Sequence, residues 1–203
     1  MRISRLIVAT LFLFTSQAGA EEVGRVLRLQ GQAAASSVET SRSLREGDRL
    51  SLGDRLTTGP GARLMAVLSD GSELTLGANT DFTIDELVLE KDRGSALFHL
   101  AKGAFRMVGG AIAKVPEHRM EIAAPLGTIG IRGTDVWGGS LKSPMDVFLI
   151  EGEISVSTPG GAVILSKPGQ GTSVTAAGQA PLPPSDWSED LRRRAFATVS
   201  FAP

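Results

Sequence analysis

The sequence predicts an all-β protein, a single domain of many short, mostly antiparallel strands with a short C-terminal helix. Apolar and polar residues alternate in many short runs, which is the pattern of a strand with one buried face. Turn residues recur roughly every 8–12 residues, a spacing that favours a sandwich or barrel over alternating strands and helices. The 24 glycines among 203 residues exceed the usual share of about 7% and fit many tight turns. A barrel-like sheet, a sandwich-like pair of sheets and a wound stack of strands all fit this pattern.

The first twenty residues have the order of a secretory signal peptide. Arg2 and Arg5 precede an apolar run over residues 6–14, and small residues then end the segment at Ala20. The apolar run is shorter than the roughly 20 residues that a membrane-spanning helix needs. We therefore expect residues 1–20 to be removed as a signal peptide. The mature protein is expected to be periplasmic or secreted, with no membrane span.

A short repeat opens the strand-rich region. The pattern Leu-x-x-Gly-Asp-x-Leu occupies residues 44–50 and occurs again at once over residues 50–56. It predicts two successive short strands, each turned at a Gly-Asp pair, where the aspartate accepts hydrogen bonds from turn amides rather than binding calcium. The two pairs are Gly47-Asp48 and Gly53-Asp54. The repeat stops after two copies, so a long solenoid is not supported.

The next two runs predict a β-hairpin. Apolar residues alternate over residues 64–68 and again over 72–76, and Asp70-Gly71 lies between the two runs. Asp-Gly between alternating runs is a strong hairpin signal, because the tight turn takes positive φ at both central residues.

The rest of the β region continues in the same way. Further strands are expected over residues 82–89 with a bulge, 96–100, 104–108, 119–122, 147–150, 154–157, 162–165 and 173–175. Gly127, Gly130 and Gly133 form a regularly spaced glycine run. No Lys-Ser/Thr follows this run as it would in a phosphate-binding loop. We interpret it as a glycine-rich turn where backbone segments approach closely.

The composition changes after the last predicted strand. Residues 176–185 are small residues and prolines, typical of a linker, and residues 186–203 are expected to form a helix and tail. Asp186 and Glu189 resemble a capping box, so we expect the helix over about 187–198. One helix face would carry Trp187, Leu191, Ala195 and Val199. That face either covers an open edge or end of the β domain or forms a site for a partner protein.

An ordered set of motifs resembles the FecR domain. The Gly-Asp repeat is followed by Leu-x-Asp-Gly-Ser at residues 68–72, then by a Gly-Thr pair and a Glu-Gly pair further along the chain. The motif residues are Gly47, Asp48, Gly53, Asp54, Asp70, Gly71, Ser72, Gly133, Thr134, Glu151 and Gly152. The resemblance covers residues 21–175, although Ala124 stands where the family often has threonine. It implies an all-β module of the kind found in periplasmic regulators of iron uptake and in other bacterial envelope proteins.

The resemblance also limits what can be transferred. Regulators of the ferric-citrate type carry a cytoplasmic anti-sigma segment and one membrane-spanning helix before this domain. A signal peptide is expected in that place here, so signalling to a sigma factor is not carried over. The resemblance implies a module that binds or regulates another envelope protein.

The side-chain inventory does not favour catalysis. The chain has no cysteine, no tyrosine and only two histidines, His99 and His118, which lack the spacing of a metal site. We therefore expect no enzyme activity, no metal and no cofactor. A formal net charge of −1 gives no basic excess for nucleic acid.

Two other functions stay open at this point. The first is a glycan- or peptidoglycan-binding envelope protein, which the 5% aromatic content disfavours because sugar sites use stacked aromatic rings. The second is a β-barrel enzyme of unrecognised type, for which neighbouring carboxylates such as Asp85 and Glu86 would be candidates. The sequence does not give the oligomeric state.

Overall fold

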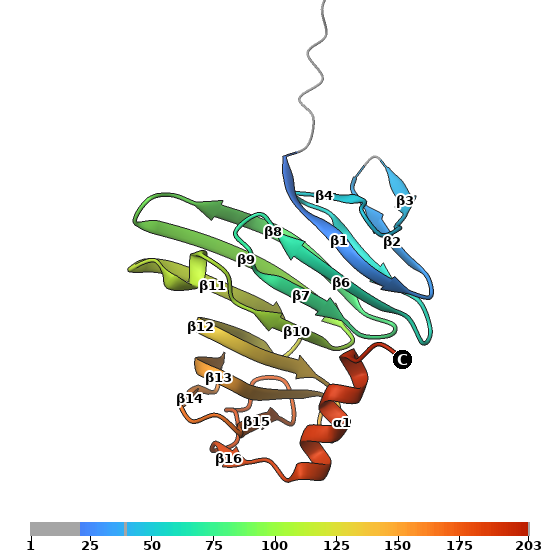
Figure 1. The fold of residues 1–203 in the computed structure, drawn as a ribbon. Coiled ribbons are helices and arrows are strands. Elements are labelled where there is room, and N and C mark those ends of the chain that lie inside the picture. The colour runs from blue at the N-terminus through green and yellow to red at the C-terminus, as the bar shows by residue number, and fades with distance from the viewer. Residues whose placement is uncertain (1–20, 39, 203) are drawn as a thin grey trace, which may run out of the picture.

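A computed structural model describes residues 21–38 and 40–202. The predicted signal peptide, residues 1–20, lies outside the described residues. The described chain is mostly strand, with one α-helix, α1 (Glu189–Val199), and one 3-10 turn, η1 (Ile112–Lys114) (Figure 1). The all-β prediction with a C-terminal helix is therefore confirmed. No helix within the described ranges has the length and apolar character needed to cross a membrane.

Sixteen strands form one continuous sheet. They are β1 (Glu22–Gln30), β2 (Ala33–Ser36), β3 (Ser41–Ser43), β4 (Arg49–Ser51), β5 (Arg55–Thr58), β6 (Arg63–Leu68), β7 (Glu73–Leu76), β8 (Asp81–Leu89), β9 (Arg93–Lys102), β10 (Phe105–Val108), β11 (Glu117–Ala124), β12 (Gly127–Gly139), β13 (Met145–Thr158), β14 (Gly161–Leu165), β15 (Gln170–Val174) and β16 (Ser185–Asp186).

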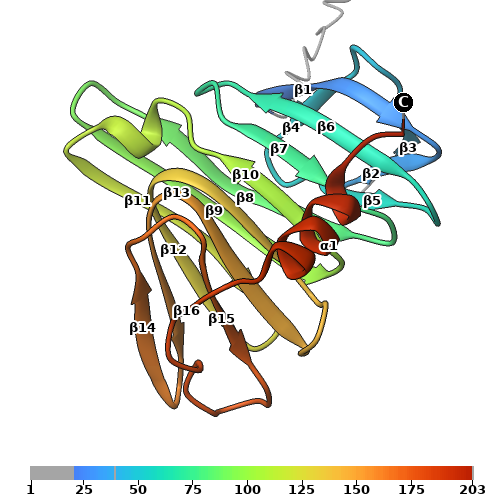
Figure 2. The ribbon, with the colours of Figure 1, turned by 60° about the horizontal axis from the view of Figure 1, so that its bottom comes forward.

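The long strand β12 divides the sheet into two arms. One edge of β12 pairs with β13, whereas the other edge pairs first with β11 and then with β10. One arm continues through β9, β8, β5, β2 and β3, and the other through β7, β6, β1 and β4. The strand pairs are antiparallel except for β9 with β11. The sheet therefore curls into a half-barrel whose two arms face each other (Figures 1 and 2).

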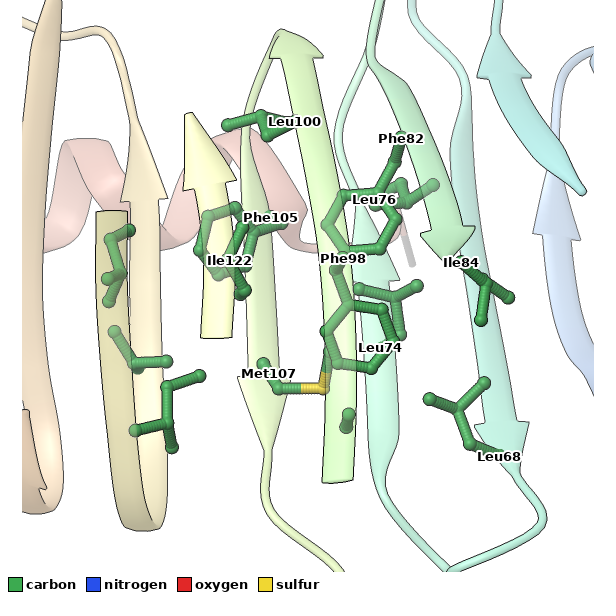
Figure 3. Close-up of a cluster of buried hydrophobic side chains, with 14 of the residues drawn as sticks. Leu68, Leu74, Leu76, Phe82, Ile84, Phe98, Leu100, Phe105, Met107 and Ile122 are labelled. Atoms are coloured by element: carbon green, nitrogen blue, oxygen red, sulfur yellow. The ribbon is translucent and has the colours of Figure 1, made fainter. Parts of the chain in front are cut away.

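The main core fills the space between the arms. Phe82 on β8 lies between Phe98 and Phe105, with ring centroids 5.6 Å and 6.1 Å away. Figure 3 shows these rings among leucine and isoleucine side chains from both arms. In strands such as β6 and β9, alternation buries every second residue. The apolar positions of the period-two pattern in the sequence are therefore the residues that point to the inner face of the half-barrel.

The predicted hairpin is confirmed, but its turn differs in detail. β6 and β7 pair, and Gly71 has a φ of 80°, but Asp70 does not have a positive φ. The Gly71 N–H donates to the Leu68 carbonyl at 2.9 Å, and the Leu68 N–H donates to the Ser72 carbonyl at 2.8 Å. This is a three-residue loop with one left-handed glycine, not a two-residue loop with two left-handed residues.

The expected glycine-rich turn is wrong. Gly127, Gly130 and Gly133 all lie within strand β12. A Cβ on Gly127 would overlap the Ser157 carbonyl oxygen on β13, so the expected close approach of backbone segments is confirmed. The glycines allow the neighbouring strand β13 to lie close to β12. They do not form a turn.

Two further boundaries differ from the prediction. The runs 147–150 and 154–157 form one strand, β13, because a bulge at residues 150–152 bends the chain without ending it. The helix begins later than expected, and the Ser188 hydroxyl accepts the Leu191 N–H at its start. Ser188, rather than Asp186, is therefore the N-cap. The bulge predicted for residues 82–89 is present in β8, where the register shifts between Ile84 and Glu86.

Candidate partner-binding site

A second apolar cluster lies on the outer face of the sheet, beneath α1. We call it the helix cluster. Its buried members are Ala104, Trp137, Phe148, Trp187, Ala195 and Val199, with Leu141, Ile150, Leu191 and Phe196 packed around them. Val136 belongs to the main core and Trp137 to the helix cluster, so successive residues of β12 point to opposite faces. The sheet therefore separates the two clusters.

The structure places the four predicted partner-binding residues in this cluster. Trp187, Ala195 and Val199 are buried, and Leu191 is half-buried. The Trp187 ring stacks on Phe148 with centroids 5.0 Å apart. The apolar face of α1 therefore packs on the sheet of its own chain. A partner can reach it only after the helix leaves the sheet.

The chain from residue 187 to 202, which we call the strap, crosses the outer face of the sheet (Figure 2). The Trp137 indole donates to the Thr198 hydroxyl at 2.9 Å, and Arg63 donates to the Ala197 carbonyl at 3.0 Å. Beyond the helix, the Ala202 N–H donates to the Gln30 side chain at 2.8 Å. These contacts join the strap to β12, β6 and β1 in turn.

Two glycines on the sheet make room for the strap. A Cβ on Gly77 would lie 2.6 Å from the Thr198 carbonyl oxygen, and one on Gly171 would overlap the Trp187 indole ring. The buried Trp187 Nε1 has no hydrogen-bond partner among the described residues. An unpaired buried N–H costs about 1–3 kcal/mol, so the strap is docked with one polar group unsatisfied.

Charged side chains cover the outward face of α1. Arg192, Arg193 and Arg194 are consecutive and exposed. Arg193 forms an ion pair with Asp190, and Arg194 donates to the Leu141 carbonyl at 3.3 Å. A partner that docks on the intact protein at this place would therefore meet arginines before it meets apolar surface.

The Asp70-Gly71-Ser72 motif joins two parts of one arm. The Asp70 carboxylate accepts the Ser72 N–H at 3.0 Å, the Ser72 hydroxyl at 2.8 Å and the Ile112 N–H at 3.3 Å. The Ser72 hydroxyl in turn accepts the Gly110 N–H at 2.9 Å. Asp70 and Ser72 are buried, so this motif ties the β6–β7 turn to the segment after β10.

The two Gly-Asp pairs form matching turns. Asp48 accepts the Arg45 N–H at 2.8 Å, and Asp54 accepts the Ser51 N–H at 2.9 Å. Gly47 and Gly53 have φ values of 87° and 81°. The predicted turns are confirmed. Asp54 is buried and also accepts two hydrogen bonds from Arg42, which raise the pKa of that guanidinium.

The Gly-Thr and Glu-Gly motifs lie opposite each other in β12 and β13. Thr134 pairs with Gly152, and Asp135 pairs with Glu151. Gly133 and Gly152 have φ values of 56° and 84°, and the register shifts on both sides of this point. The motifs therefore form facing bulges that bend the central strand pair.

Two further buried carboxylates are paired with arginines. Arg55 donates to Asp81 at 2.7 Å through Nε, and this hydrogen bond lowers the pKa of the Asp81 carboxyl. Arg106 donates to Asp135 at 2.8 Å, which raises the pKa of the Arg106 guanidinium. Each buried Asp, Ser and Thr in the described chain makes a hydrogen bond within the fold.

The two histidines do not come together. His99 is exposed on β9, and His118 on β11 contacts the Val115 carbonyl through Nδ1 at 2.7 Å. Across residues 21–38 and 40–202, no three His, Cys, Asp or Glu side chains converge as they would around a metal ion. Asp85 is exposed at the bulge of β8, and Glu86 beside it is half-buried.

A shallow groove of about 470 Å³ lies on the outer face of β8, β9 and β11. Its lining carries three glutamates and two arginines: Glu86, Glu90, Glu117, Arg93 and Arg119. Glu90 and Arg93 stand 3.6 Å apart and partly neutralise each other. This groove therefore has an excess of only one negative charge with which to select a ligand.

Sequence reasoning identified the apolar face of α1 but not the surface beneath it. Trp137 and Phe148 were missed because their strand neighbours Val136 and Val147 carry the main-core pattern. The available signal was a large aromatic residue at the position in each strand that should face solvent.

Comparisons with known proteins agree with this architecture. The family described as FecR protein matches residues 54–155, half of the chain. Two crystal structures of a predicted anti-sigma factor from Parabacteroides distasonis ATCC 8503 resemble the fold, with TM-scores of 0.54 and 0.52 and 14% sequence identity. Each alignment covers 65% of this chain and 59% of that protein. A search of curated proteins found no match. At 14% identity the structural likeness concerns the fold alone, but the family match is direct: this chain belongs to the FecR family.

Proposed function

We propose that this FecR-family protein is a non-catalytic periplasmic module that binds or regulates another protein of the cell envelope. Membership of a family of regulators supports the regulatory part of the proposal. The anti-sigma description of its structural neighbour points in the same direction. Location in the periplasm rests on the expected signal peptide.

The polar interior supports a non-catalytic role. Asp70, Asp81 and Asp135 are buried, and each accepts hydrogen bonds that hold two segments together. A general acid or base needs a group free to exchange a proton with a substrate. Hydrogen bonds within the fold already occupy these carboxylates, so their role is to hold segments of the chain together.

The strap is the observation that carries the proposed docking role. A linker precedes it, its apolar stripe packs outside the main core, and its outward face displays Arg192, Arg193 and Arg194. The stripe of Trp187, Leu191, Ala195 and Val199 fixes the helix, and the arginines make the first contact with a partner. An acidic surface on the partner matches this charge.

Capture from an envelope extract tests the docking role. Immobilised mature protein should recover a specific partner, and the triple variant Arg192→Glu, Arg193→Glu, Arg194→Glu should lose it while keeping the wild-type melting temperature. The matched control reverses Arg25, Arg45 and Arg132, three exposed arginines on other segments, and should retain the partner. Equal capture by both triple variants contradicts docking through α1.

Location is tested separately. Expression of the full chain should give a protein that osmotic shock releases and whose N-terminal residue is Glu21. An intact Met1 in the membrane fraction contradicts periplasmic release.

A further inference from the structure

Strand β14 leaves one edge of the sheet open. It pairs with β13 through residues 161–165, and within the described chain its other edge pairs with no strand. The sequence of β14 is Gly-Ala-Val-Ile-Leu, which contains no charged residue. Ile164 at its centre is 61% exposed. Figure 2 shows β14 at the margin of the molecule.

The other free edges are short or carry charge. β3 and β4 have three residues each, with Arg42 and Arg49 among them, and β16 has two residues, one of them Asp186. Within the described residues, the outer edge of β8 beyond Ile84 is also unpaired, and it carries Asp85 and Glu86. Proteins protect exposed edges by such means, because a free edge invites another strand. β14 has neither protection, so it is the unguarded edge of the described sheet.

An extended strand can form hydrogen bonds with the unpaired backbone groups of such an edge. Every second edge residue points its backbone N–H and C=O groups to the free side, where a new strand can pair with them, and side chains on alternate positions then select the partner. On β14, Ala162 and Ile164 face solvent, while Val163 packs against the main core.

We propose that the occupant is β14 of a second copy of this chain, paired antiparallel about a two-fold axis at Val163. This register puts Ile164 opposite Ala162 of the second copy and Leu165 opposite Gly161, with the two Val163 residues facing each other on the axis. On either side of the axis a large side chain therefore lies opposite a small one, which is the self-complementarity that a two-fold interface requires. The pairing extends the sheet from β13 of one copy into β13 of the other.

The charges near the edge are compatible with this pairing. Lys167 follows β14, and in this register it lies opposite Pro159 rather than opposite a second lysine. No like charges therefore face each other across the paired strands, which would be destabilising. A partner strand of another protein would need its own matching of large and small side chains, whereas β14 already matches itself.

The interface is small, so the dimer is weak. Five paired residues bury less than the roughly 1,200 Å² that separates transient contacts from stable ones. Association is therefore expected in the high micromolar range, about −5 to −6 kcal/mol at a 1 M standard state. The proposal does not depend on the docking role of α1, because β14 and the strap are separate segments.

Sedimentation velocity tests the dimer. The mature wild-type protein should sediment faster as its concentration rises from about 10 µM to about 1 mM. Ile164→Lys should remain a monomer over the same range, because a charged lysine on an edge strand opposes pairing with a second strand. Leu97→Lys is the matched control: half-buried Leu97 on β9 pairs with Glu86 of β8 and Glu121 of β11, so both edges of its strand are occupied, and this variant should associate like wild type. A wild-type protein that stays monomeric, or an Ile164→Lys variant that still associates, overturns the proposal.

A second experiment tests the two-fold axis. The chain has no cysteine, so a single introduced thiol can only form a disulfide between copies. Directly opposed residues of antiparallel strands have Cα atoms about 4.5–5.5 Å apart, within the range of a disulfide. Val163→Cys should form a dimer under mild oxidation, and Leu97→Cys, on a strand paired at both edges, should do so far more slowly. Equal rates for the two variants overturn the register.

Discussion

The main core and the helix cluster are built in different ways from the same strands. The main core lies between two arms of one sheet, and neighbouring strands hold its residues by hydrogen bonds on both sides (Figure 3). Half of the buried residues of the helix cluster come from the strap, which no strand pairing holds beyond Asp186. The comparison teaches that burial alone does not make a region essential. Residues that are equally buried can belong to the fold or to a covering that can be removed from it.

The largest effect is expected in the main core. Phe82 is fully buried between Phe98 and Phe105. Phe82→Ala should lower the free energy of unfolding by about 3–5 kcal/mol, because it removes apolar contacts from both arms and leaves a cavity. Urea unfolding followed by far-UV circular dichroism measures this loss. A loss below about 1 kcal/mol would mean that the arms do not depend on this ring for their packing.

A smaller and local effect is expected in the helix cluster. Trp187→Ala should lower stability by about 2 kcal/mol, less than a typical large-to-small change, because the strap can detach and leave the strands folded. Truncation after Pro184 should cost a similar amount. Limited trypsin digestion should cut the variant first at Arg192–Arg194 and leave the β domain intact. If the β domain is digested at the same rate as the strap, the two regions unfold as one unit.

The smallest effect is expected at the rim of the main core, and it depends on pH. The hydrogen bond from Arg55 lowers the pKa of Asp81 in the folded protein below the 3.8 of a free carboxyl. The pair therefore stabilises the fold above about pH 4, and this contribution is lost as the pH falls through the lower folded pKa. Asp81→Asn should be less stable than wild type at pH 7, and the difference should shrink as the pH falls below 3.8.

The Asp81 experiment has a matched control in Arg55→Gln. Removal of the arginine should give the same pH dependence, because it breaks the same ion pair from the other side. Urea midpoints at several pH values measure both variants. A difference from wild type that stays constant with pH would mean that the Asp81 side chain acts by packing and not by charge.

The sequence predicted those features that depend on local chemistry. The Gly-Asp turns and the β6–β7 hairpin need particular residues at particular positions, so Gly47, Gly53 and Gly71 could be recognised directly. β12 could not be recognised, because its glycines are needed to leave room for side chains far along the chain. Ser155, opposite Gly130, is one example. Local turn chemistry and long-range close approach both select glycine, and a single sequence does not separate them.

The candidate site shows the same limit. The stripe from Trp187 to Val199 has a helical period, so the sequence could predict that this face is covered. It could not predict by what, because the covering surface is assembled from Ala104 just before β10, Trp137 on β12 and Phe148 on β13. The arginines on the opposite face follow from the same period, but their exposure follows only from the packing of the helix.

The contact between the strap and β1 has a consequence for the order of folding. Ala202 binds Gln30, and the Arg28 guanidinium lies 4.5 Å from the centre of the Phe201 ring. These contacts join positions more than 170 residues apart, so closing them has a high entropic cost until the sheet has brought the two regions together. The strap therefore docks last, onto a sheet in which β1 has already paired with β4 and β6.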